Sequence, residues 1–241
     1  MRTELQPAFV LHRRPFRNTS LLLEAFTREH GRIGLVARGA SRPKARLRAL
    51  LQPFTPVLLA WLEGAELATL SAAEERGLPY AMPSARLLSG FYLNELLLRL
   101  LTRHDPYPRL FDAYQDALLG LMQADTEEPL LRQFEKTLLD ELGYGLQLGV
   151  DSVSSKPVQP DQRYHYNPQQ GPWLAQGISH DWTISGRALL ALQNDQLSEP
   201  QDLHEVKRLM RAAIGTHLDK PLRSREIMLN IQRRRHKADA V

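Results

Sequence analysis

The 241-residue chain contains no cysteine, so it can form neither a disulfide framework nor a thiolate metal site. It also lacks the roughly 18 consecutive apolar residues that a membrane span requires. Its first residues do not form the apolar core of a signal peptide. These absences predict a soluble, unprocessed cytoplasmic protein that does not bind membranes.

Sequence motifs for catalysis are missing as well. There is no G-x-x-x-x-G-K-[ST] phosphate loop and no G-x-S-x-G nucleophile elbow. The eight histidines are scattered without metal-ligand spacing, and adjacent acids lie at expected helix ends, where they complement the helix dipole. We therefore expect no enzyme activity, no cofactor and no metal site.

Positive charge gathers at one end of the chain. The first fifty residues contain eleven Lys or Arg and three acids, although the whole chain carries only +4. Residues 51–150 contain seven bases and fourteen acids, and residues 151–241 contain thirteen and ten. Because a clustered excess of arginine attracts polyanions, this pattern predicts that the N-terminal region binds nucleic acid.

Short apolar runs separated by turn residues predict strands in the first part of the chain. The expected strands cover residues 8–11, 20–27, 31–37, 55–61 and 66–70. Five strands in so short a segment predict a small barrel of the oligonucleotide-binding type, within a domain spanning residues 1–80.

Apolar residues recur at helical spacing beyond Pro83. The predicted helices cover about residues 87–101, 109–122 and 128–142. They are expected to form a central bundle over residues 81–149. Residues 150–183 are rich in Pro, Ser, Gln and Gly, which predicts an irregular insert with a small hairpin, and further helices complete a last segment, 150–241. The expected fold class is α+β.

The candidate DNA-binding residues lie in the first connection of the barrel and in a basic segment that Gly, Ser and Pro are expected to keep as a loop. They are Arg13, Arg14, Phe16, Arg17, Arg38, Arg42, Lys44, Arg46 and Arg48. The basic side chains can pair with phosphates, and the ring of Phe16 can stack on a base. The alternative is a solvated arginine face with Phe16 in the core.

Two further basic groups lie later in the chain. The run Arg233-Arg234-Arg235-His236-Lys237 is explained equally well as an added DNA contact and as a solubilising end. The other group combines cations with apolar neighbours and could hold an acidic peptide with a hydrophobic end, although ordinary helix-surface pairing explains each arginine. Its members are Leu131, Arg132, Phe134, Arg187, Arg208 and Arg211.

Several strings, taken together and in order along the whole chain, resemble the RecO family of bacterial recombination mediators. They include Ala8-Phe9-Val10-Leu11-His12-Arg13-Arg14-Pro15, Leu51-Gln52-Pro53-Phe54-Thr55-Pro56, Leu142-Gly143-Tyr144-Gly145 and Lys220-Pro221-Leu222-Arg223-Ser224-Arg225. The resemblance implies an oligonucleotide-binding barrel, a helical bundle and a C-terminal part that carries a four-cysteine zinc site in many members. Since this chain has no cysteine, zinc is not expected, and packing around Tyr164, Tyr166 and Trp173 must hold the insert.

The resemblance also implies a non-enzymatic mediator of DNA repair and recombination. Such a protein binds single- and double-stranded DNA, anneals complementary strands and, with RecR, helps to load RecA onto DNA coated by single-stranded DNA-binding protein (SSB). The segment Leu131-Arg132-Gln133-Phe134 matches the family helix that binds the acidic C-terminal tail of SSB. We expect a nucleoid-associated monomer.

Two other functions remain open at this point. One is a protein-interaction scaffold that does not bind DNA directly. The other is a metal-dependent nuclease, which is less favoured because the basic region holds only Glu4, Glu24 and Glu29, far apart in sequence.

Overall fold

The structure is a computed structural model that describes residues 2–42, 46–64, 67–123, 125–176 and 182–238. The chain divides into two compact units. Residues 1–124 and 220–241 form the first, here called the barrel unit, and residues 125–219 form the second, here called the inserted unit. These boundaries differ from the three consecutive segments expected from the sequence, because the C-terminal helix packs with the N-terminal part of the chain.

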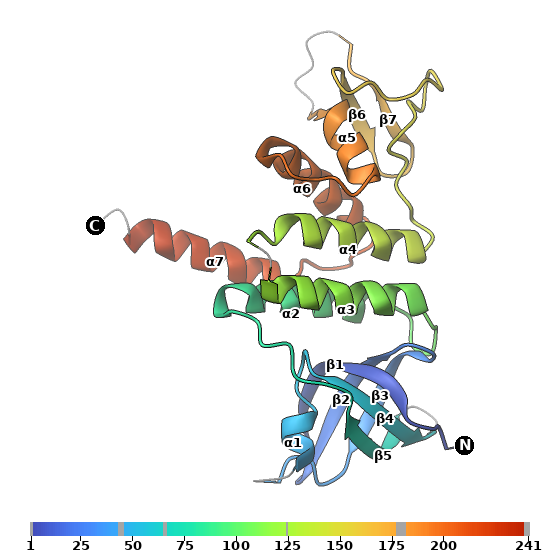
Figure 1. The fold of residues 1–241 in the computed structure, drawn as a ribbon, viewed down its shortest axis with the longest axis vertical. Coiled ribbons are helices and arrows are strands. Elements are labelled where there is room, and N and C mark those ends of the chain that lie inside the picture. The colour runs from blue at the N-terminus through green and yellow to red at the C-terminus, as the bar shows by residue number, and fades with distance from the viewer. Residues whose placement is uncertain (1, 43–45, 65–66, 124, 177–181, 239–241) are drawn as a thin grey trace. The chain divides into compact units, whose positions relative to one another are not determined.

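Five strands close into a barrel at the N-terminus (Figure 1), which confirms the predicted α+β class. They are β1 (Gln6–Phe16), β2 (Ser20–Thr27), β3 (Gly31–Ala37), β4 (Pro56–Leu62) and β5 (Ala68–Glu75). The strand order is β1-β2-β3-β5-β4, and only the β3–β5 pairing is parallel. The fifth strand starts and ends later than predicted, because its last residues lack the apolar run that marks the other strands.

The second strand shows how the barrel is built. Side chains of a strand point alternately to its two faces. Leu23 and Ala25 therefore belong to the core inside the barrel, whereas Phe26 faces outward and lies 5.5 Å, between ring centroids, from Phe111 of the helical part. Both faces of β2 are buried, which explains its almost uninterrupted apolar sequence.

Two helices, α2 (Leu87–Leu100) and α3 (Pro108–Gln123), pack on the barrel after a short 3-10 turn, η1 (Ser84–Arg86). A buried chain of hydrogen bonds fixes them. The hydroxyl of Tyr114 donates to Oδ1 of Asn94 over 2.5 Å, and Nδ2 of Asn94 donates to the backbone oxygen of Leu11 over 2.9 Å. Leu11 lies where the β1–β2 register shifts, so the irregularity offers its carbonyl to α2.

The C-terminal helix α7 (Arg223–Ala238) returns to this unit and packs against α2. The carboxylate of Glu95 on α2 accepts hydrogen bonds from the backbone N–H groups of Arg223 and Ser224, at 2.8 and 2.9 Å, and from the Ser224 hydroxyl at 2.6 Å. Burial opposes ionisation of Glu95, but these hydrogen bonds outweigh it and hold its pKa below the ordinary value. Glu95 thus caps α7 from a different helix.

In the inserted unit, α4 and α5 pack on α6 beside a small sheet with strand order β7-β6-β8. The elements are α4 (Glu128–Glu141), β6 (Arg163–Asn167), β7 (Gly171–Leu174), β8 (Ile184–Ser185), α5 (Gly186–Gln193) and α6 (Pro200–Gly215). The helix expected to complete a three-helix bundle, α4, therefore belongs to this unit, whereas α2 and α3 belong to the barrel unit.

A buried carboxylate organises the segment that precedes the small sheet. Oδ1 of Asp151 accepts from the backbone N–H groups of Val153 and Ser154, at 2.9 and 2.7 Å, and Oδ2 accepts from that of Leu174 at 2.7 Å. Burial opposes ionisation, yet the hydrogen bonds lower the pKa of Asp151. Asp151 thereby joins its own turn to β7, in a region where sequence analysis had expected only aromatic packing.

Aromatic residues contribute to the same region. Tyr164 is buried and its hydroxyl accepts from the backbone N–H of Gln159 at 2.8 Å. Tyr166 is half-buried and donates to the backbone oxygen of Gln147 at 3.0 Å, and burial raises the pKa of its phenol.

Candidate nucleic-acid interface

The candidate DNA-binding residues come together at one end of the barrel. Because β1 ends at Phe16, β2 begins at Ser20 and β3 ends at Ala37, which pairs with Leu21, the β1–β2 turn lies beside the segment after β3. The backbone N–H of Ser41 donates to the oxygen of Thr19 over 2.9 Å and joins the two segments. We call this the basic end. It comprises Arg13, Arg14, Phe16, Arg17, Arg38, Arg42, Arg46 and Arg48, while Lys44 lies outside the described residues.

Part of the expected loop is a short helix, α1 (Arg46–Leu50). The prediction of an irregular segment up to Arg48 was wrong, because Arg, Leu and Ala are strong helix formers and Leu50 is buried in the barrel core. Nη1 of Arg13 donates to the backbone oxygen of Arg48 over 3.1 Å and attaches α1 to β1. Burial, and secondarily the charge of Arg48, lower the pKa of Arg13.

Most arginines of the basic end are free to meet an anion. Arg14, Arg17, Arg38, Arg42, Arg46 and Arg48 are exposed, whereas Arg13 and Phe16 are half-buried. Arg46 lies 3.7 Å from Glu75, but both side chains are more than two-thirds exposed, so the pair contributes little. Among the described residues, the other exposed arginines of this end form no ion pair. Their charge is available to a polyanion.

The aromatic residue of this end carries a cation on its ring. The guanidinium carbon of Arg17 lies 5.2 Å from the ring centroid of Phe16, within cation–π range. Arg17 itself has φ of 53°, the left-handed region that tight turns require. Phe16 is outside the barrel core, so its ring and the guanidinium above it form one stacking surface at the turn.

The opposite end of β2 also carries arginines, but they are compensated. We call this the paired end. Arg28 donates to both carboxylate oxygens of Asp112 on α3, at 3.1 and 2.9 Å, and to Glu29 at 2.8 Å, which raises the pKa of Arg28. Arg32 donates to the backbone oxygen of Leu98 over 2.9 Å and lies 3.6 Å from Glu24, which is also paired with Arg103. The paired end therefore attaches the barrel to its helices.

The residues proposed for peptide-tail binding fall into three environments. Leu131, Arg132 and Phe134 are buried in α4, where Nη2 of Arg132 lies 2.8 Å from Oε1 of Glu135. Arg187 on α5 is exposed and is paired with Asp202. Arg208 and Arg211 are exposed on α6.

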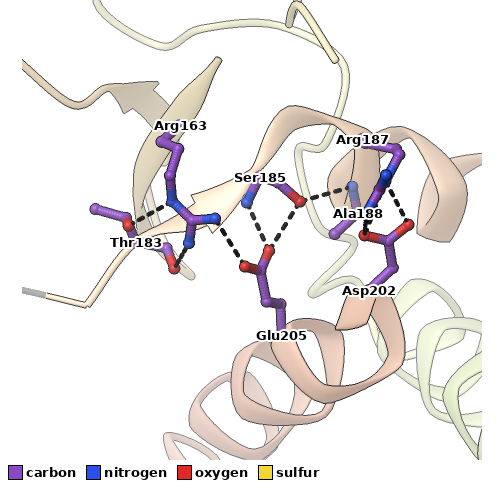
Figure 2. A network of polar contacts seen from close by, with 7 residues as sticks. All are labelled: Arg163, Thr183, Ser185, Arg187, Ala188, Asp202 and Glu205. Atoms are coloured by element: carbon purple, nitrogen blue, oxygen red, sulfur yellow. Dashed lines mark hydrogen bonds and ion pairs between the residues drawn. The ribbon is translucent and has the colours of Figure 1, made fainter. Parts of the chain in front are cut away.

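The two buried acids of α6 take part in a network of polar contacts with β6, β8 and α5 (Figure 2). Asp202 accepts hydrogen bonds from two nitrogens of Arg187 on α5, at 2.9–3.1 Å. Glu205 accepts hydrogen bonds from Arg163 and from the backbone N–H and hydroxyl of Ser185, at 2.7–2.8 Å. Burial opposes ionisation of Glu205, but these donors lower its pKa. On the outer face, the guanidinium of Arg208 lies 5.1 Å over the ring of Trp182, a contact that sequence analysis missed.

No group of three or more His, Cys, Asp or Glu residues in the described ranges is arranged to hold a metal ion. Among the same residues, no helix combines the length and the apolar character needed to cross a membrane.

A closed five-stranded barrel with a cationic end and helices packed on its side defines a protein of the oligonucleotide-binding barrel class. The chain belongs to the RecO family, which acts in DNA repair and recombination. Residues 1–77 match the family model "Recombination protein O N terminal" and residues 84–226 match "Recombination protein O C terminal". The boundary between the two matches follows the last barrel strand.

Relatives resemble the chain over nearly its whole length. The DNA repair protein RecO of Coxiella burnetii (strain RSA 493 / Nine Mile phase I) is 46% identical over 228 residues, which cover 94% of this chain and 98% of the relative. RecO of Nitrosococcus oceani is 44% identical over 237 residues, covering 97% and 96%. RecO of Methylococcus capsulatus is 45% identical over 227 residues, covering 94% and 93%.

Proposed function

We propose that this protein is a non-enzymatic recombination mediator that binds single- and double-stranded DNA at the basic end and anneals complementary strands. One observation carries the proposal. Among the described residues, the exposed arginines of the basic end have no partner carboxylate apart from the weak, solvent-exposed Arg46–Glu75 contact, whereas Arg28 and Arg32 at the paired end are compensated. Unpaired arginines at either end would make the protein equally soluble, so solubility does not explain why only the basic end keeps its charge uncompensated. Binding of a polyanion at that end does explain it.

The free energy for remodelling DNA would come from binding, since the chain has no phosphate-loop motif. Each phosphate that an arginine neutralises releases condensed counterions, which favours association. Two strands neutralised on one surface repel each other less, so their pairing becomes faster. The Phe16–Arg17 surface would favour unstacked bases of a single strand.

Two protein interactions belong to the proposal. The acidic tail of SSB would bind the inserted unit, and RecR would act with this protein to load RecA. For the tail, Arg208 and Arg211 are exposed, so they are the cations best placed to meet carboxylates. Leu131, Arg132 and Phe134 are buried, so we assign them the support of that surface from within α4.

The experiment that tests DNA binding compares two double variants in the full chain. Arg38→Ala/Arg42→Ala removes two charges from the basic end, and Arg76→Ala/Arg99→Ala removes two exposed charges elsewhere in the barrel unit. At 0.1 M salt each lost phosphate contact costs a single strand about fivefold in affinity, so we expect about 25-fold from the first variant. Fluorescence anisotropy with a labelled oligonucleotide measures this.

The matched control decides the outcome. Equal losses in the two variants would mean that overall charge, and not the basic end, binds DNA. No binding by the unaltered protein would favour a scaffold that acts without DNA. Cleavage of labelled DNA in Mg²⁺ or Mn²⁺ would instead indicate a nuclease.

A further inference from the structure

Large apolar side chains remain exposed on α2 and α7, two helices that pack against each other. The described residues include twelve exposed large hydrophobic side chains, and five of them lie on these two helices. They are Leu87, Phe91, Ile227, Leu229 and Ile231, which are each 38–48% exposed. Single exposed apolar residues are ordinary, but such a concentration marks an interaction surface.

Helical spacing aligns four of these residues, Leu87 and Phe91 on α2 and Ile227 and Ile231 on α7, along one stripe of each helix. Leu87, Phe91 and Glu95 are four residues apart, so they share one stripe of α2. Because Glu95 binds the first residues of α7, and α7 runs alongside α2 in Figure 1, the same stripe borders α7. Ile227 and Ile231 are also four residues apart. We call these five exposed side chains the α2–α7 surface.

The charge around this surface is positive. Residues 223–238 contain six Lys or Arg and a single acid, Glu226, and the barrel unit as a whole contains 23 bases and 13 acids. Nε of Arg225 is buried and has no hydrogen-bond acceptor among the described residues. The positive charge of this unit would attract a partner that carries carboxylates. A second copy of this unit would instead be repelled.

The arrangement of apolar residues favours a protein partner over a lipid surface. At 100° per residue, Leu229 lies about 200° around α7 from Ile227, so no single flat face collects the apolar side chains. A membrane-surface helix presents one such face. A partner helix needs only an apolar stripe beside a second helix, which Leu87 and Phe91 provide next to Ile227 and Ile231.

We propose that the α2–α7 surface docks an amphipathic helix with an acidic face, contributed by a partner protein. The apolar stripe of that helix covers Leu87, Phe91, Ile227 and Ile231, and its carboxylates meet cations such as Arg225 and Arg233. This interaction is separate from DNA binding at the basic end and from tail binding at the inserted unit.

The test uses the full chain and a fluorescein-labelled 18-residue helical peptide with leucines at helical spacing and glutamates elsewhere. Ile227→Glu/Ile231→Glu introduces charge into the surface, and Arg233→Glu reverses one flanking cation. Leu62→Glu is the matched control, because Leu62 is 46% exposed on β4 of the barrel. Thermal melting verifies that each variant is folded.

We expect micromolar binding by the unaltered chain, a loss of at least tenfold with Ile227→Glu/Ile231→Glu, and a smaller, salt-dependent loss with Arg233→Glu. Leu62→Glu should bind as the unaltered chain does. The same leucine peptide with lysines in place of glutamates should not bind. Equal binding by Ile227→Glu/Ile231→Glu and Leu62→Glu would overturn the proposal. The proposal would also be overturned if the unaltered chain bound phosphatidylglycerol vesicles or an oligonucleotide through Ile227 and Ile231 and did not bind the acidic peptide.

Discussion

The arginines at the two ends of β2 differ in whether the fold supplies them with partners. At the paired end, Arg28 and Arg32 meet Asp112, Glu24 and a backbone oxygen, so their charge stabilises the attachment of α2 and α3 to the barrel. At the basic end, the exposed arginines lack such partners among the described residues, apart from the weak Arg46–Glu75 contact. Whether the charge of an arginine is used within the fold or stays available therefore depends on whether the fold places a carboxylate or carbonyl oxygen beside it.

The largest expected effect lies at the paired end and concerns stability. Arg32→Ala removes a half-buried hydrogen bond to Leu98 and one of the two cations near Glu24, whose side chain is only 16% exposed. Leaving such groups unsatisfied costs about 1–3 kcal/mol. Urea unfolding measures the loss. The affinity for an oligonucleotide should stay within about twofold, and a large loss of affinity in the folded variant would remove the distinction between the ends.

A smaller effect separates stacking from charge at the basic end. Phe16→Ala should lower the affinity for single-stranded DNA by about 1 kcal/mol, because stacking on an aromatic ring contributes about 1–3 kcal/mol per base and Arg17 already covers one face of this ring. Duplex DNA has no unstacked bases and should bind almost as before. Parallel titrations with both kinds of DNA check this, and equal losses would show that Phe16 only holds the turn.

The smallest effect concerns the attachment of α7, which lies at neither end. The pKa of Glu95 is lowered in the folded chain, so its contribution to stability is present above the unfolded pKa and is lost as the pH falls through the folded pKa. We expect Glu95→Gln to cost about 1 kcal/mol at pH 7 and less in acid. Melting curves from pH 7 to pH 3 compare the two chains. An equal difference at every pH would contradict the role of its charge.

Much of the barrel could be predicted from the sequence, because apolar runs of β1 to β4 and the turns between them are local signals. The closeness of Arg17 to Arg38 and Arg42 was not predicted, because it depends on the β2–β3 register that brings the β1–β2 turn beside the segment after β3. The pairing of Arg28 with Asp112 could not be predicted, since the two residues are 84 positions apart and each looks like a solvated surface charge.

The short helix α1 and the division of the helices between two units were missed for similar reasons. Glycine, serine and proline before α1 concealed a five-residue helix whose stability depends on burying Leu50. The helices α2, α3 and α4 share the same amphipathic pattern. This pattern indicates that each helix has a buried face, but it does not indicate which other element covers that face. The role of Asp151 depends on backbone donors from its own turn and from Leu174, 23 residues further on, which no sequence pattern reveals.

The salt dependence of single-stranded DNA affinity tests the central claim most directly. We would measure it for the unaltered chain, for Arg38→Ala/Arg42→Ala/Arg46→Ala/Arg48→Ala at the basic end, and for Arg28→Ala at the paired end. At about 0.7 per phosphate contact, the slope of log affinity against log salt should flatten by up to about 2.8 in the first variant and stay unchanged in Arg28→Ala. An unchanged slope in a folded basic-end variant would contradict the account.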